Sequence, residues 1–140
     1  MTQHLLKLAV GVDDNDHLSR IQKERLQKEG VLRHFTRNAP RRREDVLDGG
    51  SLYWVIRGVI RARQRLVDIE SGLRREDGAP LCAFVLDPKL VRTQPVSFRP
   101  FQGWRYLSEE KAPKDLDASM ASAQDMPEEM ARELRVLGLL

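Results

Sequence analysis

A row of arginines directly follows the most apolar stretch of the chain. Arg61, Arg63 and Arg65 alternate with uncharged residues. On a β-strand, alternate residues share one face and lie about 7 Å apart, which is close to the spacing of phosphates along a nucleic-acid strand. Arginine also presents a planar set of donors that suits phosphate. The row therefore predicts phosphate contacts, and Arg37 could extend it.

Aromatic and amide side chains near this row, or near Gly103, could complete a binding surface. Trp54 and Trp104 could stack on unpaired bases, as aromatic residues do in single-stranded RNA binding. Gln64 and Arg105 offer directional hydrogen-bond donors. The candidate binding residues are Arg37, Trp54, Arg61, Arg63, Gln64, Arg65, Gln102, Trp104 and Arg105. The alternative is that the aromatic residues belong to the core and that the arginines pair with local carboxylates.

The sequence contains no clear catalytic or metal-ligating set. The histidines His4, His17 and His34 lack ligand spacing, and Cys82 is the only cysteine. Neighbouring apolar residues would raise the pKa of the Cys82 thiol rather than activate it. The Gly49-Gly50 pair lacks the lysine of a phosphate-binding loop. We therefore expect no catalytic residue, no metal and no cofactor.

Charge is distributed unevenly along the chain. Nine arginines and three carboxylates lie between positions 33 and 65, whereas eight carboxylates and four basic residues follow Leu107. The basic part favours a polyanionic partner such as RNA. The acidic part favours the alternative, a protein partner or a second copy of the chain.

Length and composition predict a single domain over residues 1–140. Hydrophobic residues make up 41% and charged residues 32%, which is typical of a globular rather than a disordered chain. No apolar run approaches the roughly 20 residues of a membrane helix. Residues 5–12 lack the basic leader and the cleavage site of a signal peptide. We expect a cytoplasmic protein without a membrane segment.

The first third of the chain has clear local signals. Residues 4–12 predict a strand, and an aspartate cap followed by Gly30 predicts a helix from about Asp16 to Glu29. Residues 31–37 alternate loosely enough for a short strand. Pro40 then favours a short helix over residues 41–47.

The stretch from about residue 52 to 70 fits either a helix or two strands. Its β-branched and aromatic residues, together with Gly58, favour two strands, about Leu52–Arg57 and Val59–Glu70, bent or bulged at Gly58. A helix would place Arg63 away from the other two arginines of the row. The phosphate hypothesis therefore depends on the strands.

The remaining segments complete an α+β fold. Strands are expected at about residues 81–87, 91–99 and 101–107, and the second of them is an edge because of its prolines. An irregular acidic segment should cover about 108–126, and a helix about 127–138. The expected sheet is mostly antiparallel, with a barrel-like arrangement as one form, and has an N-terminal and a C-terminal helix.

Five strings in this sequence resemble a small bacterial family known only as a domain of unknown function of about this length. They are Gly49–Gly58, Ala62–Arg65, Val85–Pro88, Arg99–Leu107 and Glu133–Leu140. The resemblance implies no activity. A weaker likeness, in general layout, is to the small β-barrels of the pseudouridine-synthase-associated type, which often bind RNA. That likeness implies RNA binding only by analogy of fold.

The leading hypothesis from the sequence is a non-catalytic RNA-binding module. One alternative is a protein-interaction or homo-oligomeric module. Another is a small-molecule enzyme with a pocket near Arg63, Gln64, Gln102 and Arg105.

Overall fold

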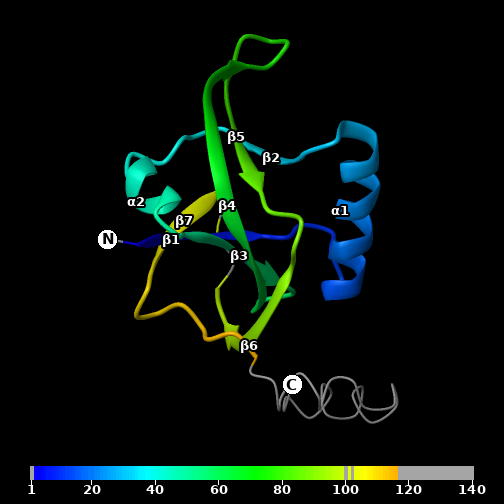
Figure 1. Ribbon diagram of the computed structural model, residues 1–140, viewed down its shortest axis with the longest axis vertical. Coiled ribbons are helices and arrows are strands. Elements are labelled where there is room, and N and C mark those ends of the chain that lie inside the picture. Colours follow the sequence, from blue (N-terminus) through cyan, green and yellow to red (C-terminus); the bar gives the residue numbers. More distant parts are fainter. Residues whose placement is uncertain (1, 100, 102, 117–140) are drawn as a thin grey trace.

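In the described residues, seven strands form one mostly antiparallel sheet, and both helices pack against the same one of its two hydrophobic clusters (Figure 1). The computed structural model describes residues 2–99, 101 and 103–116. The elements in chain order are β1 (Gln3–Leu8), α1 (Asn15–Glu29), β2 (Leu32–Thr36), α2 (Arg43–Leu47), β3 (Ser51–Ile56), β4 (Val59–Arg74), β5 (Pro80–Leu86), β6 (Val91–Ser97) and β7 (Trp104–Ser108). The α+β class and the predicted strands are confirmed.

The strand order is β2-β5-β4-β3-β1-β7, and β6 also pairs with β4. Only β1 and β3 run parallel; the other pairs are antiparallel. The sheet is not closed, because β2 and β7 stand at opposite ends of this order in the described part of the chain. The barrel-like expectation is therefore not supported. The expected helix at 127–138 and most of the acidic segment at 108–126 lie outside the described residues.

Helix α1 begins and ends where the sequence predicts. The Asp14 side chain accepts a hydrogen bond of 2.7 Å from the backbone N–H of His17. Gly30 has φ 75°, and its N–H donates to the carbonyl of Leu26 at 2.8 Å. Both ends of the helix are thus satisfied by local groups, as expected for an N-cap aspartate and a C-terminal glycine.

The ambiguous central stretch is a β-hairpin, so the helix alternative is wrong. Ile56 pairs with Val59, which leaves Arg57 and Gly58 as a two-residue turn. These two residues have φ 51° and 78°. Positive φ at both positions is typical of the turns that match the twist of a hairpin. Gly58 therefore reverses the chain rather than bending one strand.

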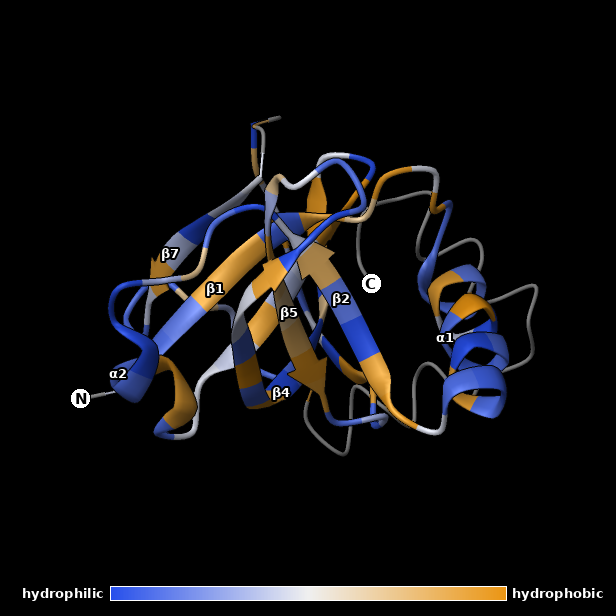
Figure 2. Cartoon of the chain, turned by 90° about the horizontal axis from the view of Figure 1, so that it is seen from above, coloured by the Kyte–Doolittle hydropathy of each residue, from blue (hydrophilic) through white to orange (hydrophobic). Residues whose placement is uncertain are grey.

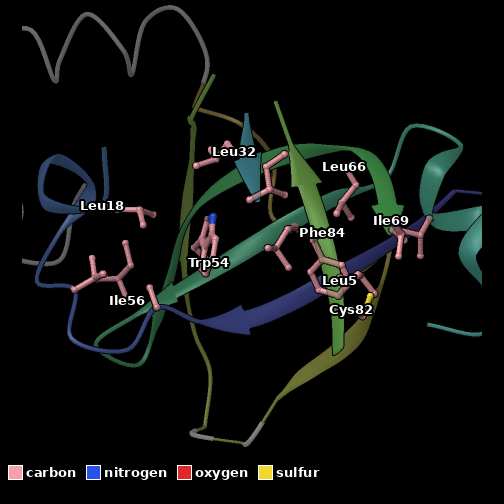
Figure 3. Packing of buried hydrophobic residues seen from close by; sticks show 14 residues of the cluster. Leu5, Leu18, Leu32, Trp54, Ile56, Leu66, Ile69, Cys82 and Phe84 are labelled. Atoms are coloured by element: carbon pink, nitrogen blue, oxygen red, sulfur yellow. The ribbon is translucent and has the colours of Figure 1, made fainter. Parts of the chain in front are cut away.

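Strand β3 separates two hydrophobic clusters because it is buried on both faces. Leu52, Trp54 and Ile56 pack in the cluster beneath α1, while Tyr53 and Val55 pack in the cluster on the other face. Figure 3 shows Leu18 of α1 directed at Trp54, and Figure 2 shows hydrophobic and hydrophilic residues alternating along the strands. The expectation that residues 52–56 form core is confirmed.

A buried network of amides joins α1 to the sheet. Gln22 Nε2 donates to Gln64 Oε1 at 2.7 Å, and Gln64 Nε2 donates back to Gln22 Oε1 at 2.8 Å. Gln64 Oε1 also accepts from Trp54 Nε1 at 2.8 Å, and its Nε2 donates to the carbonyl of Asp87 at 3.1 Å. Gln64 is 0% exposed. All polar atoms of this side chain are thus used inside the protein.

Replacing Gln64 should therefore destabilise the fold strongly. Gln64→Leu leaves the Gln22 amide and the Trp54 indole N–H buried without partners, and each such group costs about 1–3 kcal/mol. We expect the free energy of unfolding in urea to fall by roughly 3 kcal/mol. Gln27→Leu, an exposed glutamine on the same helix, is the control and should change it little. The double variant Gln22→Leu/Gln64→Leu should cost less than the sum of the single changes; additive costs would contradict the network.

Candidate ligand cavity

A cavity of about 270 Å³ lies between α1 and the sheet. Its walls are mostly apolar, with basic side chains at several points. The lining residues are Lys7, Leu8, Ala9, Val10, Val12, Leu18, Ile21, Gln22, Arg25, Leu32, Arg33, His34, Trp54 and Leu86. No carboxyl, hydroxyl or thiol side chain is among them. The set can bind a ligand, and its only groups of a type used in catalysis are the amine of Lys7 and the imidazole of His34.

Helix α1 supplies one wall because its inward residues follow helical spacing. Leu18, Ile21, Gln22 and Arg25 recur at intervals of three or four residues and therefore share one face of the helix. The Gln22 amide is already bound to Gln64, so it fixes this wall and is not free for a ligand. The helix thus presents apolar side chains and one guanidinium.

The aromatic floor of the cavity is held in place by two contacts. Trp54 is bound through its indole N–H to Gln64. The ring of His34 on β2 meets the ring of Trp54 edge to face, with centroids 5.1 Å apart and an interplanar angle of 88°. Edge-to-face contact is a favoured arrangement of such rings. Neither ring can move far without breaking these contacts.

Three basic side chains converge on this cavity from β1, α1 and β2. Lys7, Arg25 and His34 have no hydrogen-bond or ion-pair partner among the described residues. The fourth, Arg33, is paired with Glu70 at 2.6 Å. Burial lowers the pKa of Lys7. An anion in the cavity would give these side chains a partner of opposite charge.

The pKa of His34 reflects this environment. Burial, and to a lesser extent the charges of Lys7 and Arg25, lower its pKa to about 4. Its Nε2 atom is buried and has no hydrogen-bond partner in the described part of the chain. The imidazole is therefore neutral near pH 7 and retains hydrogen-bonding capacity that no described group uses.

The arginine row does not lie on one face, because a bulge interrupts β4. Ala62 pairs with Trp54 but Ile60 pairs with Val55, so Arg61 is an extra residue in the ladder. An extra residue breaks the alternation of faces. Arg61 consequently lines a separate cavity of about 270 Å³ at the N-terminus of α1, beside Asp13 to Asp16 and with Arg57 and Arg92. The expected even row is thus wrong at Arg61.

Arg63 and Arg65 have different surroundings as well. Arg63 lies on the face opposite α1, where its Nε and Nη2 donate to the two carboxylate oxygens of Asp115, each at 2.6 Å, and its Nη1 donates to Ser51 Oγ at 3.0 Å. Arg65 is exposed and lacks a side-chain partner among the residues described. Of the row, Arg63 is tied into the fold, and Arg65 remains open to solvent.

Two further predicted residues, Trp54 and Gln64, are interior. Their relative exposures are 3% and 0%. Trp54 is therefore not exposed at the surface, but its ring borders the cavity, and its stacking on a base stays a prediction. Gln64 and Arg63 are neighbours on β4 that point to opposite faces, so they cannot line one pocket. The enzyme alternative loses its site for this reason.

The last four predicted residues are scattered. Trp104 is half-buried, and its Nε1 donates to the carbonyl of Asn38 at 2.7 Å. Arg105 is exposed and lies over the ring of Phe101 at 5.2 Å. Arg37 is exposed beside the β4–β5 hairpin, in a hollow of about 250 Å³. Gln102 lies outside the described residues. These side chains therefore do not form one site.

Sequence reasoning missed Lys7, Arg25 and His34. Two of them carried a usable signal: Lys7 interrupts the apolar string Leu5-Leu6-Lys7-Leu8, and His34 occupies an inward position of the alternating segment at β2. A basic residue on an inward face is unusual and is a reason to expect a ligand or a partner. Arg25, on an exposed-looking helix position, carried none.

Two other kinds of site were considered over the described residues. No group of three or more His, Cys, Asp or Glu side chains there is arranged to hold a metal ion. No helix among the same residues is both long and apolar enough to cross a membrane.

The Arg63–Asp115 pair should stabilise the fold in a pH-dependent way. The Arg63 hydrogen bond lowers the pKa of Asp115, so this stabilisation is present above the ordinary aspartate pKa and is lost as pH falls through the lowered one. Arg63→Met should reduce the free energy of unfolding at pH 7 by about 1–2 kcal/mol, with a smaller loss at about pH 3. Arg65→Met, two residues away and unpaired, should change it by less than about 0.5 kcal/mol. Equal effects of the two variants in urea denaturation would contradict the assignment.

His34 should make the protein less stable in mild acid. Its folded pKa of about 4 lies below the ordinary histidine value of 6.5, so only the unfolded chain takes up the proton between these values. Stability contributed by the neutral ring is complete above pH 6.5 and is lost as pH falls towards 4, by up to about 3 kcal/mol. His34→Phe should flatten the pH dependence of unfolding across this window, whereas the control His17→Gln should not. An unchanged profile for His34→Phe would contradict the burial argument.

Comparison with known proteins places the chain in a family. No curated protein and no solved structure matches it. The family described as "Protein of unknown function (DUF1489)" matches residues 5–140, which is nearly the whole chain. The match agrees with the resemblance found in the sequence, and the chain therefore belongs to the DUF1489 family.

Proposed function

We propose that this protein is a non-catalytic module that binds single-stranded RNA at the cavity between α1 and the sheet. The observation that carries the proposal is the convergence of Lys7, Arg25 and His34, without partners in the described residues, on an apolar cavity that no carboxylate lines. Such a site suits a ligand that combines an apolar planar part with negative charge. A nucleotide has both parts.

The net positive charge of residues 1–116 favours a polyanionic ligand over a single small anion. Residues 1–116 contain 22 Lys and Arg against 16 Asp and Glu. This excess raises the local concentration of nucleic acid through long-range attraction. Arg20 and Lys23 continue the basic character of α1 outside the cavity and are exposed. A strand seated at the cavity would therefore meet further cations along the helix.

The other features expected from the sequence stay predictions. They are a single domain over residues 1–140, a bacterial origin and a cytoplasmic location. The protein-interaction alternative depended on the acidic C-terminal segment, which lies outside the described residues. Mass measurement in solution with and without residues 127–140 remains its test.

Removing the cations at the cavity should weaken RNA binding and its dependence on salt. Each lost phosphate contact lowers the slope of log Kobs against log[salt] by about 0.7 for a single strand, so Lys7→Met/Arg25→Met should lower it by about 1.4. The measurement is fluorescence anisotropy with a labelled mixed-sequence RNA of roughly 10 nucleotides.

The matched control is Arg74→Met/Arg75→Met. It removes the same charge from the β4–β5 hairpin, which projects from the sheet (Figure 1). We expect this control to bind RNA nearly as well as the wild type. Equal losses in both double variants would show attraction by net charge alone and would refute the cavity as the site. No binding of RNA by the wild type at low salt would refute the proposed function.

A further inference from the structure

We infer that the cavity holds one unstacked base, with the phosphate of the same nucleotide at Lys7 and Arg25. This inference rests on the proposed function and specifies which part of the ligand enters the protein. The alternative is that the strand passes over the surface and only its backbone touches the basic side chains. Three features favour the bound base over the surface arrangement. They are the volume of the cavity, the chemistry of its walls, and the imidazole whose hydrogen-bonding capacity is unused.

The size of the cavity suits a single ring system. Its volume of about 270 Å³ lies at the small end of the roughly 300–1,000 Å³ of small-molecule sites. A surface that tracks a backbone needs no such enclosed space. The sheet contributes Leu32, Trp54 and Leu86 to the walls, and α1 contributes Leu18 and Ile21, so a flat ligand between them meets apolar or aromatic residues on each face.

A few polar groups accompany the apolar residues in the lining. His34 is beside Trp54 and has hydrogen-bonding capacity that no described residue uses. A neutral imidazole can both donate and accept one hydrogen bond, which matches the mixed edge of a nucleobase better than a purely apolar ligand. Lys7 and Arg25 supply the positive charge for a phosphate. One nucleotide therefore satisfies every unpartnered basic group of the cavity.

A shallow hollow offers a path for the rest of the strand. It has a volume of about 410 Å³, lies over residues 8–13, and shares Leu8, Ala9, Val10 and Val12 with the cavity. Val10 on its rim is 86% exposed. Arg57 and Asp13, which form an ion pair of 3.1 Å, line the same hollow. A base could thus enter the cavity while its neighbours run along the loop.

Trp54 provides a direct reporter of a base in the cavity. In a Trp104→Phe protein, Trp54 is the only tryptophan, so its fluorescence isolates this site. The probes are the four nucleoside 5′-monophosphates and, as the matched compound without a base, ribose 5-phosphate. We expect at least one nucleotide to quench Trp54 in a saturable way, and ribose 5-phosphate to leave the fluorescence unchanged.

A variant that fills the cavity tests the same point on RNA. Ile21→Phe enlarges a side chain that lines the cavity, whereas Leu26→Phe makes the same kind of change on α1 at a half-buried residue outside it. We expect Ile21→Phe to weaken both nucleotide quenching and RNA binding by on the order of tenfold, as removal of a base-stacking contact does. Leu26→Phe should leave both unchanged. Thermal melting confirms that both variants are folded.

The outcomes separate the inference from the proposed function. If RNA binds at low salt but no nucleotide quenches Trp54 and Ile21→Phe binds RNA normally, the base pocket is refuted and RNA binding stands. If nucleotides quench Trp54 and Ile21→Phe abolishes this, while RNA does not bind, the pocket stands for free nucleotides and the proposed function fails. If neither ligand binds, both fail. Quenching by ribose 5-phosphate equal to that by nucleotides also refutes the base pocket.

Discussion

The reciprocal hydrogen bonds between Gln22 and Gln64 set the position of α1, and the cavity depends on that position. The two amides satisfy each other inside the protein, and Gln64 also satisfies the indole of Trp54. A buried amide that loses its partner is costly, so a shift of α1 along the sheet by even one residue is disfavoured. Apolar contacts alone tolerate such shifts because they have no direction. The helix is thus held in one register by polar groups.

This arrangement also fixes the surroundings of the unpartnered basic groups at the cavity. Burial, and to a lesser extent the charges of Lys7 and Arg25, lower the pKa of His34 and so disfavour a proton on its ring. A helix further from the sheet would expose the ring to water and remove the larger of these causes. The amide network and the two capped ends of α1 resist that movement. Energetically unfavourable groups that other interactions hold in position are typical of a binding site rather than of a structural core.

Local signals accounted for the elements of the fold. The Asp14 cap, Gly30 and the alternation around β5 depend on a few consecutive residues, and the structure follows them. Pro95 indicated an edge or a meandering path; β6 pairs with β4 on one side and forms a single β-bridge, Thr93 to Asp115, on the other. The arginine row failed because the bulge at Arg61 depends on how β4 pairs with β3, and no residue within β4 marks it. Closure of the sheet likewise depends on where β2 and β7 end in the strand order, which no local pattern specifies.

The candidate site could not be predicted from local sequence patterns either, because it also depends on how distant segments pack. Lys7, Arg25 and His34 belong to three elements and approach one another only because α1 crosses the face formed by β1, β3 and β2. Arginines close together in sequence were the more visible feature, yet the fold disperses them: Arg61 lies beside aspartates, Arg63 is bound to Asp115, and Arg65 faces solvent. Density of charge along the chain therefore did not predict where the cavity lies. The better indicator of location is a basic side chain at an inward position, where the surrounding apolar residues give it no partner and a ligand can supply one.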